Sequence, residues 1–269
     1  MDGSRSATYT HGHDDSVLRS HRWRTAENSC GYLLPRLRPG HQLLDVGSGP
    51  GTITADLARH VAPGAVTAVE LTDAAADLTR AELRRQGVAA TTVVSDVHAL
   101  DLPDDAFDVS HAHQVLQHVA DPVQALRELA RVTRPGGIVA VRDSDYAAFA
   151  WWPRLPGLEE WMTLYQAAAR ANGGEPDAGR RLLSWAQQAG LPQAIPSSST
   201  WCLATPQDRR WWGEMWADRI TTSTVAQQAL RDGLADEATL HRISQAWRAW
   251  AAAPDGWLSV LHGELIVPV

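Results

Sequence analysis

The sequence predicts a doubly wound α/β fold whose core is a mostly parallel sheet of seven strands. Two observations favour this fold. A buried strand ends in a turn with three glycines and continues into a helix, and strands and helices then alternate without a break from residue 41 to 143. Connections of this kind are right-handed, so successive strands align in parallel. In such sheets ligands bind outside the carboxyl ends of the strands.

The first unit is the stretch LLDVGSGPGTIT, which begins at Leu43. Its apolar start predicts a buried strand that ends at Val46. Glycine lets the backbone turn sharply and lets a ligand approach without a Cβ in the way. Pro50 suits the first position of a helix, where a missing N–H costs nothing. The glycines of the turn are Gly47, Gly49 and Gly51. The apolar stripe of the following helix is formed by Ile53, Leu57 and Val61.

Two ligands fit this turn, a dinucleotide and S-adenosyl-L-methionine (SAM). The dinucleotide fingerprint needs a third glycine at position 52, which is Thr52 here. Asp45 instead places a carboxylate at the end of the strand. A carboxylate repels a pyrophosphate but attracts the amino group of SAM. The turn therefore favours SAM, and an NAD-dependent oxidoreductase is the less favoured alternative.

Acidic residues follow the next two predicted strands. Glu70 ends a strand at residues 65–69, about 20 positions beyond the glycine turn, where an acid can accept hydrogen bonds from ribose hydroxyls. Asp96 follows a strand at residues 91–94 and can accept a hydrogen bond from the adenine amino group. Val97 can pack on the adenine ring. Leu71 and Gln114 are also expected to contact the cofactor.

Two further strands complete the repeating part of the chain, one ending near His113 and one at residues 138–141. The helix before the third strand is expected to be capped by Asp73 and to end at Gly87. A later helix begins with Asp121 as its cap and a proline in its first turn, a typical helix start.

Beyond residue 145 the chain becomes rich in tryptophan, with 11 of the 12 tryptophans between Trp151 and Trp257. Helices are expected at residues 157–172 and 178–190, and strands at 194–204 and 256–267. The stretch 206–254 reads as a helical lid inserted between these last two strands. Most of its tryptophans are expected in a core or a subunit contact, and the others in an aromatic pocket for a flat or apolar acceptor. The predicted division is 1–40, N-terminal arm and helix; 41–205, SAM-binding core; 206–254, lid; 255–269, final core strand.

Residues 41–145 resemble the class I SAM-dependent methyltransferases, particularly the branch related to ubiquinone and menaquinone biosynthesis. The motifs that carry the resemblance are Asp45-Val46-Gly47-Ser48-Gly49-Pro50-Gly51, Glu70, Asp96, Leu102-Pro103 before Phe107-Asp108, Leu116-Gln117-His118-Val119, Asp121-Pro122 and Arg134-Pro135-Gly136-Gly137. The resemblance implies a Rossmann-like core and a cofactor held by Gly47, Glu70, Asp96 and Val97. It places His113 beside the sulfonium, where the family more often has Ser, Asn or Cys. It does not extend to a quinone substrate.

His113 is the residue expected to handle a proton, because a neutral imidazole beside the sulfonium can accept one from a phenol, enol or amine. A cofactor contact without proton transfer is the alternative for His113. Near the N-terminus, Tyr9, His11 and His13 form either a solvated arm or a flap over the cofactor, and Tyr9 is included among the expected cofactor contacts. A helix is expected from about residue 15 to 34.

Composition excludes several other functions. The net charge is −7, all 24 basic residues are Arg, and they form no basic stripe, so no nucleic-acid partner is expected. Two cysteines give neither a disulfide framework nor metal-type spacing. No apolar run suits a signal or membrane span, so a cytoplasmic protein without membrane contact is expected. A homodimer is compatible with the sequence.

The sequence thus predicts a SAM-dependent methyltransferase that acts on a small, largely apolar or aromatic acceptor, such as a secondary metabolite, and releases S-adenosylhomocysteine (SAH). A SAM-binding protein that does not methylate, either a sensor or a SAM-assisted cyclase, is the alternative from another class. The acceptor atom, whether carbon, nitrogen, oxygen or sulfur, is left open.

Overall fold

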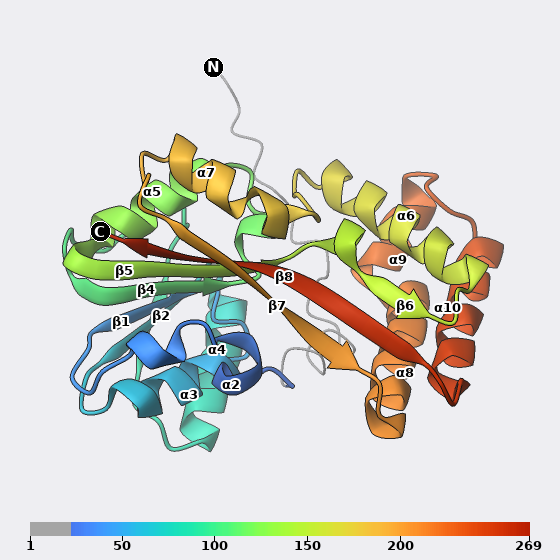
Figure 1. Ribbon diagram of the computed structural model, residues 1–269, viewed down its shortest axis with the longest axis horizontal. Helices are drawn as coiled ribbons and strands as arrows, with labels where there is room; N and C mark the ends of the chain where they lie inside the picture. Colours follow the sequence, from blue (N-terminus) through green and yellow to red (C-terminus); the bar gives the residue numbers. More distant parts are fainter. Residues whose placement is uncertain (1–22) are drawn as a thin grey trace.

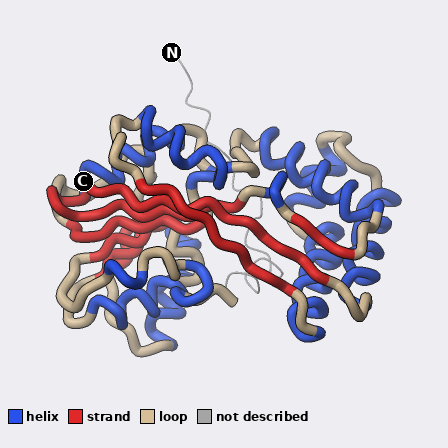
Figure 2. The backbone as a smooth tube through the Cα atoms, viewed as in Figure 1, coloured by secondary structure: helices blue, strands red, loops and turns tan. Residues whose placement is uncertain are grey.

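The computed structural model describes residues 23–269 (Figure 1). Tyr9, His11 and His13 lie outside the described residues, so the expected flap stays a prediction. Within residues 23–269 the chain forms a twisted sheet with helices on both faces and a helical body at one end (Figure 2).

The sheet has the strand order β3-β2-β1-β4-β5-β8-β6, and β7 also pairs with β8. The first five strands are parallel, whereas β8 is antiparallel to β5, β6 and β7. This confirms the predicted doubly wound, mostly parallel fold, to which the short strand β6 adds an eighth strand. The strands are β1 Leu43–Val46, β2 Val66–Glu70, β3 Thr91–Val94, β4 Phe107–His113, β5 Thr133–Ser144, β6 Ala150–Trp152, β7 Ile195–Leu203 and β8 Trp257–Pro268.

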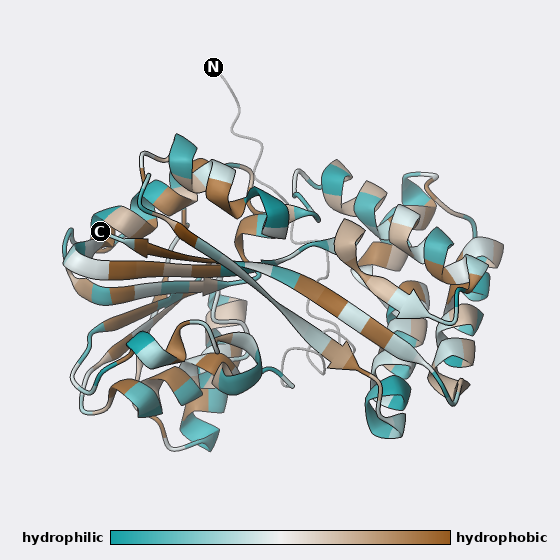
Figure 3. Ribbon diagram, viewed as in Figure 1, coloured by the Kyte–Doolittle hydropathy of each residue, from teal (hydrophilic) through white to brown (hydrophobic). Residues whose placement is uncertain are grey.

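Helices cover both faces of the parallel strands. On one face α2 (Ala26–Ser29), the 3₁₀ turn η1 (Leu34–Arg36) and α3 (Thr52–Val61) contribute to a core with one side of β1, β4 and β5. On the other face α5 (Pro122–Val132) and α7 (Leu182–Gln188) contribute to a second core. Helix α4 (Asp73–Arg85) packs beside α3. Figure 3 shows the resulting pattern, with hydrophobic residues along the central strands and hydrophilic residues on the outer helix surfaces.

The helical body has a core of its own, which is rich in tryptophan. Its helices α8 (Pro206–Thr222), α9 (Thr224–Arg231) and α10 (Glu237–Ala252) lie between β7 and β8 in the chain, as predicted. Helix α6 (Pro156–Ala171) packs against α10 and α9 and completes the body. Strands β7 and β8 extend from the parallel sheet toward the body and pack against it at their far ends (Figure 1).

Four local expectations differ from the structure. Pro50 is not the first residue of a helix, because α3 begins at Thr52 with Gly51 as its cap. In the described part of residues 15–34, the only α-helix is α2, which ends at Ser29 with Cys30 as its C-cap; Asn28 bonds back to the N-cap Thr25, and η1 with Pro35 follows. Thr72, not Asp73, caps α4 through its hydroxyl.

The predicted helix at 178–190 begins as the 3₁₀ turn η4 (Ala178–Arg181) before α7. This turn lies close to β8, where a Cβ on Gly179 would lie 2.7 Å from the backbone nitrogen of Gly263. The remaining 3₁₀ turns are η2 (Leu116–His118) and η3 (Tyr146–Ala148).

Candidate functional site

The glycine turn lies at the carboxyl end of β1. Gly47, Gly49 and Gly51 have φ angles of 69°, 56° and 86°, which L side chains rarely adopt. A Cβ on Gly47 would also lie 2.4 Å from Cγ2 of Val115. Glycine is therefore required at position 47 both by the backbone conformation and by the approach of the segment after β4.

Glu70 lies beside this turn at the end of β2. Its carboxylate accepts a hydrogen bond from the backbone N–H of Gly49, and the hydroxyl of Ser48 lies 3.5 Å from the same oxygen. Burial raises the pKa of Glu70 to about 7, although these hydrogen bonds oppose the shift. An acid whose charge changes near neutral pH thus closes one side of the glycine turn.

Leu71 and Asp96 extend the same edge of the sheet. Strands β2 and β3 are parallel and pair Glu70 with Val94, so the residues that follow these strands lie at one edge. Leu71 is 58% exposed, which is unusual for a large apolar side chain next to a buried strand. Burial alone would raise the pKa of Asp96, but two hydrogen bonds from His98 outweigh it and lower this pKa. Val97 is buried in the core on the α5 side.

Asp45 faces protein and not the open edge. It is 2% exposed. One carboxylate oxygen accepts a hydrogen bond from the Thr54 hydroxyl at 2.6 Å, and the other lies 2.8 Å from His111 Nδ1. The other ring nitrogen of His111 lies 3.3 Å from Cys30 Sγ. Burial would lower the pKa of His111, but Cys30 and Asp45 outweigh it and raise the pKa to about 10. In this arrangement the Asp45 carboxylate is not free for the expected contact with the SAM amino group.

His113 ends β4 and is buried, with 6% of its surface exposed. Neither ring nitrogen has a hydrogen-bond partner among residues 23–269. Burial and then the nearby Arg142 guanidinium lower the pKa of His113 well below its usual value. The imidazole is therefore neutral at physiological pH, and one of its nitrogens is available as a proton acceptor.

Gln114 follows His113 in a left-handed conformation with φ 55°, an uncommon conformation for a residue other than glycine. Its side-chain amide lies 2.8 Å from the Ser144 hydroxyl and 2.8 Å from His262 Nε2. These contacts join the carboxyl ends of β4 and β5 to the middle of β8. Backbone strain of this kind is most often found at functional sites.

A chain of aromatic rings connects the helical body to His113. Trp211 on α8 packs against Trp23, with ring centroids 5.2 Å apart, and Trp23 packs against Trp201 on β7 at 5.2 Å. Trp201 in turn lies 6.0 Å from the His113 ring and 4.4 Å from the His262 ring. We call Trp211, Trp23, Trp201, His262 and His113 the aromatic chain.

Sequence reasoning missed the ion pair between Arg142 and Glu264 beside this chain. Arg142 Nε lies 3.2 Å from Glu264 Oε1, and the two side chains are 1% and 5% exposed. The signal was weak, because Arg142 follows the apolar run 138–141 together with other polar residues, and Glu264 only precedes the apolar run 265–267. Tyr32 and His262, which also lie in this region, carried no such signal.

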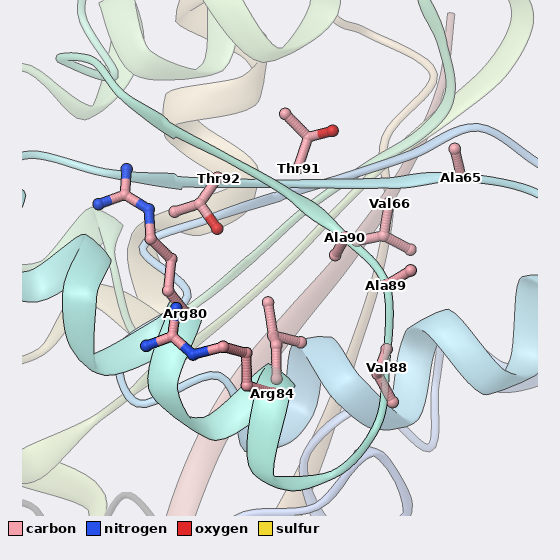
Figure 4. A pocket seen from close by; sticks show the side chains of 10 residues that line it. Ala65, Val66, Arg80, Arg84, Val88, Ala89, Ala90, Thr91 and Thr92 are labelled. Atoms are coloured by element: carbon pink, nitrogen blue, oxygen red, sulfur yellow. The ribbon is translucent and has the colours of Figure 1, made fainter.

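The hollow in Figure 4 lies elsewhere. It is lined by the amino ends of β2 and β3 and the last turns of α4, with Arg80, Arg84 and Thr92 around it. It therefore opens at the end of the sheet opposite the glycine turn. Among residues 23–269 no group of His, Cys, Asp and Glu could hold a metal ion, and no helix is long and apolar enough to cross a membrane.

Comparisons with known proteins agree on one family. The family described as methyltransferase domain matches residues 44–141. An uncharacterized methyltransferase of Schizosaccharomyces pombe is 33% identical over 269 aligned positions, which cover 96% of this chain and 95% of that protein. A probable methyltransferase of Aspergillus luteorubrus is 25% identical, over 96% of each chain. The crystal structure of the cyclase SpnF has a TM-score of 0.51 at 20% identity, covers 96% of this chain and 87% of that chain, and shows the fold alone.

Proposed function

Because the chain belongs to the class I SAM-dependent methyltransferases, we propose that it methylates a small, largely apolar or aromatic acceptor. The aromatic chain is the observation that carries this proposal. It runs from α8 of the helical body to His113 at the carboxyl end of β4, the end of the sheet at which ligands of such folds bind. Flat apolar rings at this position suit an acceptor of the same character.

The residues at the carboxyl ends of β1 to β3 fit the cofactor SAM. The glycine turn leaves room for a ligand at the backbone, and Glu70 offers a carboxylate oxygen to ribose hydroxyls. The exposed Leu71 supplies an apolar surface for adenine. Asp96 keeps a second carboxylate oxygen for the adenine amino group. We propose Gly47, Gly49, Gly51, Glu70, Leu71, Asp96, Val97, His113 and Gln114 as the cofactor site.

When bound, SAM supplies an electrophilic methyl group on a sulfonium centre. The residues of this chain have two tasks in the transfer. They align the acceptor and exclude water, which the buried surroundings of His113 and Trp201 support. His113, held neutral by burial and by Arg142, accepts the proton of an acceptor that must lose one. Gln114 acts as a positioning residue, because it joins the carboxyl ends of β4 and β5 to His262 in the middle of β8.

The direct test combines binding and turnover. SAM, SAH and NAD are titrated into the purified protein by calorimetry, and methyl-labelled SAM is then incubated with a panel of small aromatic and aliphatic acceptors. We expect SAM and SAH to bind, NAD not to bind, and label to appear in at least one aromatic acceptor with equal release of SAH. Bound SAM with no transfer to any acceptor would indicate a sensor. Conversion of a substrate without SAH release would indicate a SAM-assisted cyclase.

The division into a SAM-binding core at 41–205 with a final strand at 255–269 and a lid at 206–254 also stays a proposal. Its structural support is the separate tryptophan-rich core of the helical body, and the packing of α6 extends that body beyond the proposed boundary. A homodimer stays a prediction, which sedimentation equilibrium of the purified protein checks.

A further inference from the structure

We propose that the acceptor carries a phenolic or enolic hydroxyl and that Arg142, Tyr32 and His113 bind this oxygen. The inference rests on the function proposed above and narrows its acceptor to one chemical class. It starts from buried polar atoms of these three residues that the fold leaves without partners.

The first observation is a row of polar side chains across four strands. The register pairs His113 with Arg142, Arg142 with Glu264, and Glu264 with Ser197, so these residues lie side by side on one face of the sheet. Adjacent strands lie about 4.8 Å apart, so neighbours in the row are within reach of one ligand group. The row ends at His113, which the aromatic chain connects to the helical body.

The second observation is the incomplete pairing of Arg142. Its Nε lies 3.2 Å from Glu264 and its Nη2 lies 3.1 Å from the Ser199 hydroxyl, but Nη1 has no partner in the described part of the chain. A guanidinium carries five N–H donors, and buried donors are nearly always paired. Nη1 is thus a charged donor that can bind an oxygen atom of a ligand.

Tyr32 and His113 add further buried atoms without partners. The Tyr32 hydroxyl and both ring nitrogens of His113 are inaccessible and make no hydrogen bond within residues 23–269. The charges of Arg142 and Glu264 act on Tyr32, and the charge of Arg142 acts on His113. Leaving a buried polar atom without a hydrogen bond destabilises the fold. Four such atoms belong to three residues on one face of the sheet, where Tyr32 packs against the core that contains Ala140 and Ile266, and we take them to mark a ligand site.

The chemistry of these atoms matches a hydroxyl that gives up its proton. Arg142 and Tyr32 supply donors for the oxygen, and neutral His113 supplies an acceptor for the proton. The proton moves from the hydroxyl oxygen to a ring nitrogen of His113, and the resulting oxyanion is stabilised by the Arg142 charge. Trp201 provides a flat surface at the same place, because the Arg142 guanidinium lies 5.1 Å from its ring centroid.

The test uses two probes of nearly the same shape, 4-nitrophenol and 4-nitroanisole, of which only the first has an ionisable hydroxyl. Binding to the protein saturated with SAH is measured by calorimetry, and ionisation of the phenol by its absorbance. We expect 4-nitrophenol to bind about tenfold more tightly than 4-nitroanisole, as one charge-assisted hydrogen bond allows, with more phenolate than in buffer. Equal binding of the two probes would overturn the proposal.

Tyr32→Phe is the sharpest variant, because it removes a hydroxyl that has no partner in residues 23–269. A structural role predicts no loss of binding, whereas the proposal predicts weaker 4-nitrophenol binding by about threefold to tenfold with an unchanged or raised Tm. The double variant Arg142→Gln/Glu264→Gln removes both charges together. It should bind 4-nitrophenol and 4-nitroanisole equally well. Glu264→Gln alone is the matched control and should keep the preference for the phenol. A preference that survives in both Tyr32→Phe and the double variant would refute the assignment.

SAH itself carries an oxyanion, the carboxylate of its amino-acid part, which Arg142 could bind in place of the acceptor oxygen. A further comparison distinguishes the two. SAH and 5′-methylthioadenosine, which lacks that part, are titrated into the wild type and into the double variant. The proposal predicts that the affinity of the double variant for each ligand stays within about threefold of that of the wild type. A loss of SAH binding alone would assign Arg142 to the cofactor carboxylate and overturn the proposal. Failure of SAH to bind the wild type would instead contradict the proposed function.

Discussion

Glu70 links cofactor binding to pH. Burial raises its pKa from 4.5 to about 7, so part of the protein carries a protonated Glu70 at neutral pH. Ribose hydroxyls donate to the charged carboxylate, and protonation removes one acceptor. We therefore expect SAH to bind about tenfold more weakly at about pH 6 than at about pH 8, measured by calorimetry. Without ligand, the same shift lowers the free energy of unfolding as the pH rises from 4.5 to about 7.

Two variants identify the group responsible. Glu70→Gln should bind SAH weakly and with no pH slope in this range. Asp96→Asn should keep the slope, because the pKa of Asp96 lies below its usual value. A slope that persists in Glu70→Gln would assign the titration to another group, such as Asp143, whose pKa burial also raises to about 7.

His113 distinguishes base catalysis from alignment alone. His113→Gln keeps a hydrogen-bonding side chain of similar reach but removes the base. If His113 takes the proton from the methyl acceptor, the turnover rate of the variant at saturation should fall at least about tenfold, while its SAH affinity stays unchanged. Steady-state kinetics and calorimetry on the same preparations measure both quantities. Weaker SAH binding with unchanged turnover would make His113 a cofactor contact without a role in proton transfer.

Single residues also show where sequence reasoning stops. The pattern before the glycine turn identified Asp45 as an important acid, but not the direction in which it points. That direction depends on Thr54 in the first turn of α3 and on His111, which the register places opposite Asp45 on β4. A carboxylate between two buried donors is held by the protein, whereas Glu70 is only partly buried and lies beside the glycine turn, where it accepts from the Gly49 N–H.

At the scale of elements, the five parallel strands could be predicted because each combines an apolar run with a turn or cap signal. Strand β6 and the end of the expected helix near Cys30 could not be predicted from the sequence. Strand β6 forms because β8 extends past the parallel sheet and offers an edge at Trp257–Ser259, a tertiary contact that local sequence does not encode. The pairing of Arg142 with Glu264 depends likewise on the register between β5 and β8, which are more than a hundred residues apart in the chain.

Two tryptophans of α8 should behave differently. Trp216 is 1% exposed and packs among Trp161 and Trp247, whereas Trp211 is partly buried and belongs to the aromatic chain. We expect Trp216→Ala to lower the free energy of unfolding by about 3–5 kcal/mol. Trp211→Ala should lower it less but raise the acceptor KM by about tenfold, because it removes an aromatic wall. Denaturant unfolding and kinetics measure the two effects.

SAH affinity is the control for both variants and should stay within about threefold of the wild type, because neither side chain lies at the glycine turn. A Trp211→Ala protein that unfolds as easily as Trp216→Ala, with an unchanged KM, would return Trp211 to a purely structural role.

At the scale of the whole molecule, the protein has separate cores on the two faces of the sheet and in the helical body. The cofactor residues belong to the sheet, and the tryptophans belong mainly to the body. Strands β7 and β8 connect the two parts, and Trp201 and His262 of the aromatic chain lie on these strands. The proposed cofactor site therefore lies at the parallel strands, whereas the proposed acceptor site lies where the aromatic chain joins the sheet to the helical body.

This division predicts a pattern of amide hydrogen exchange. SAH should slow exchange in the glycine turn at residues 47–52 and in the segment after β4, because ligand binding stabilises the groups it contacts. It should leave α8 and α10 unchanged, because their amides are protected by the separate tryptophan-rich core. Mass spectrometry of peptides from both parts measures this in one experiment, with the apo protein as the control. Protection of α8 and α10 by SAH alone would mean that the helical body closes on the cofactor and not on the acceptor.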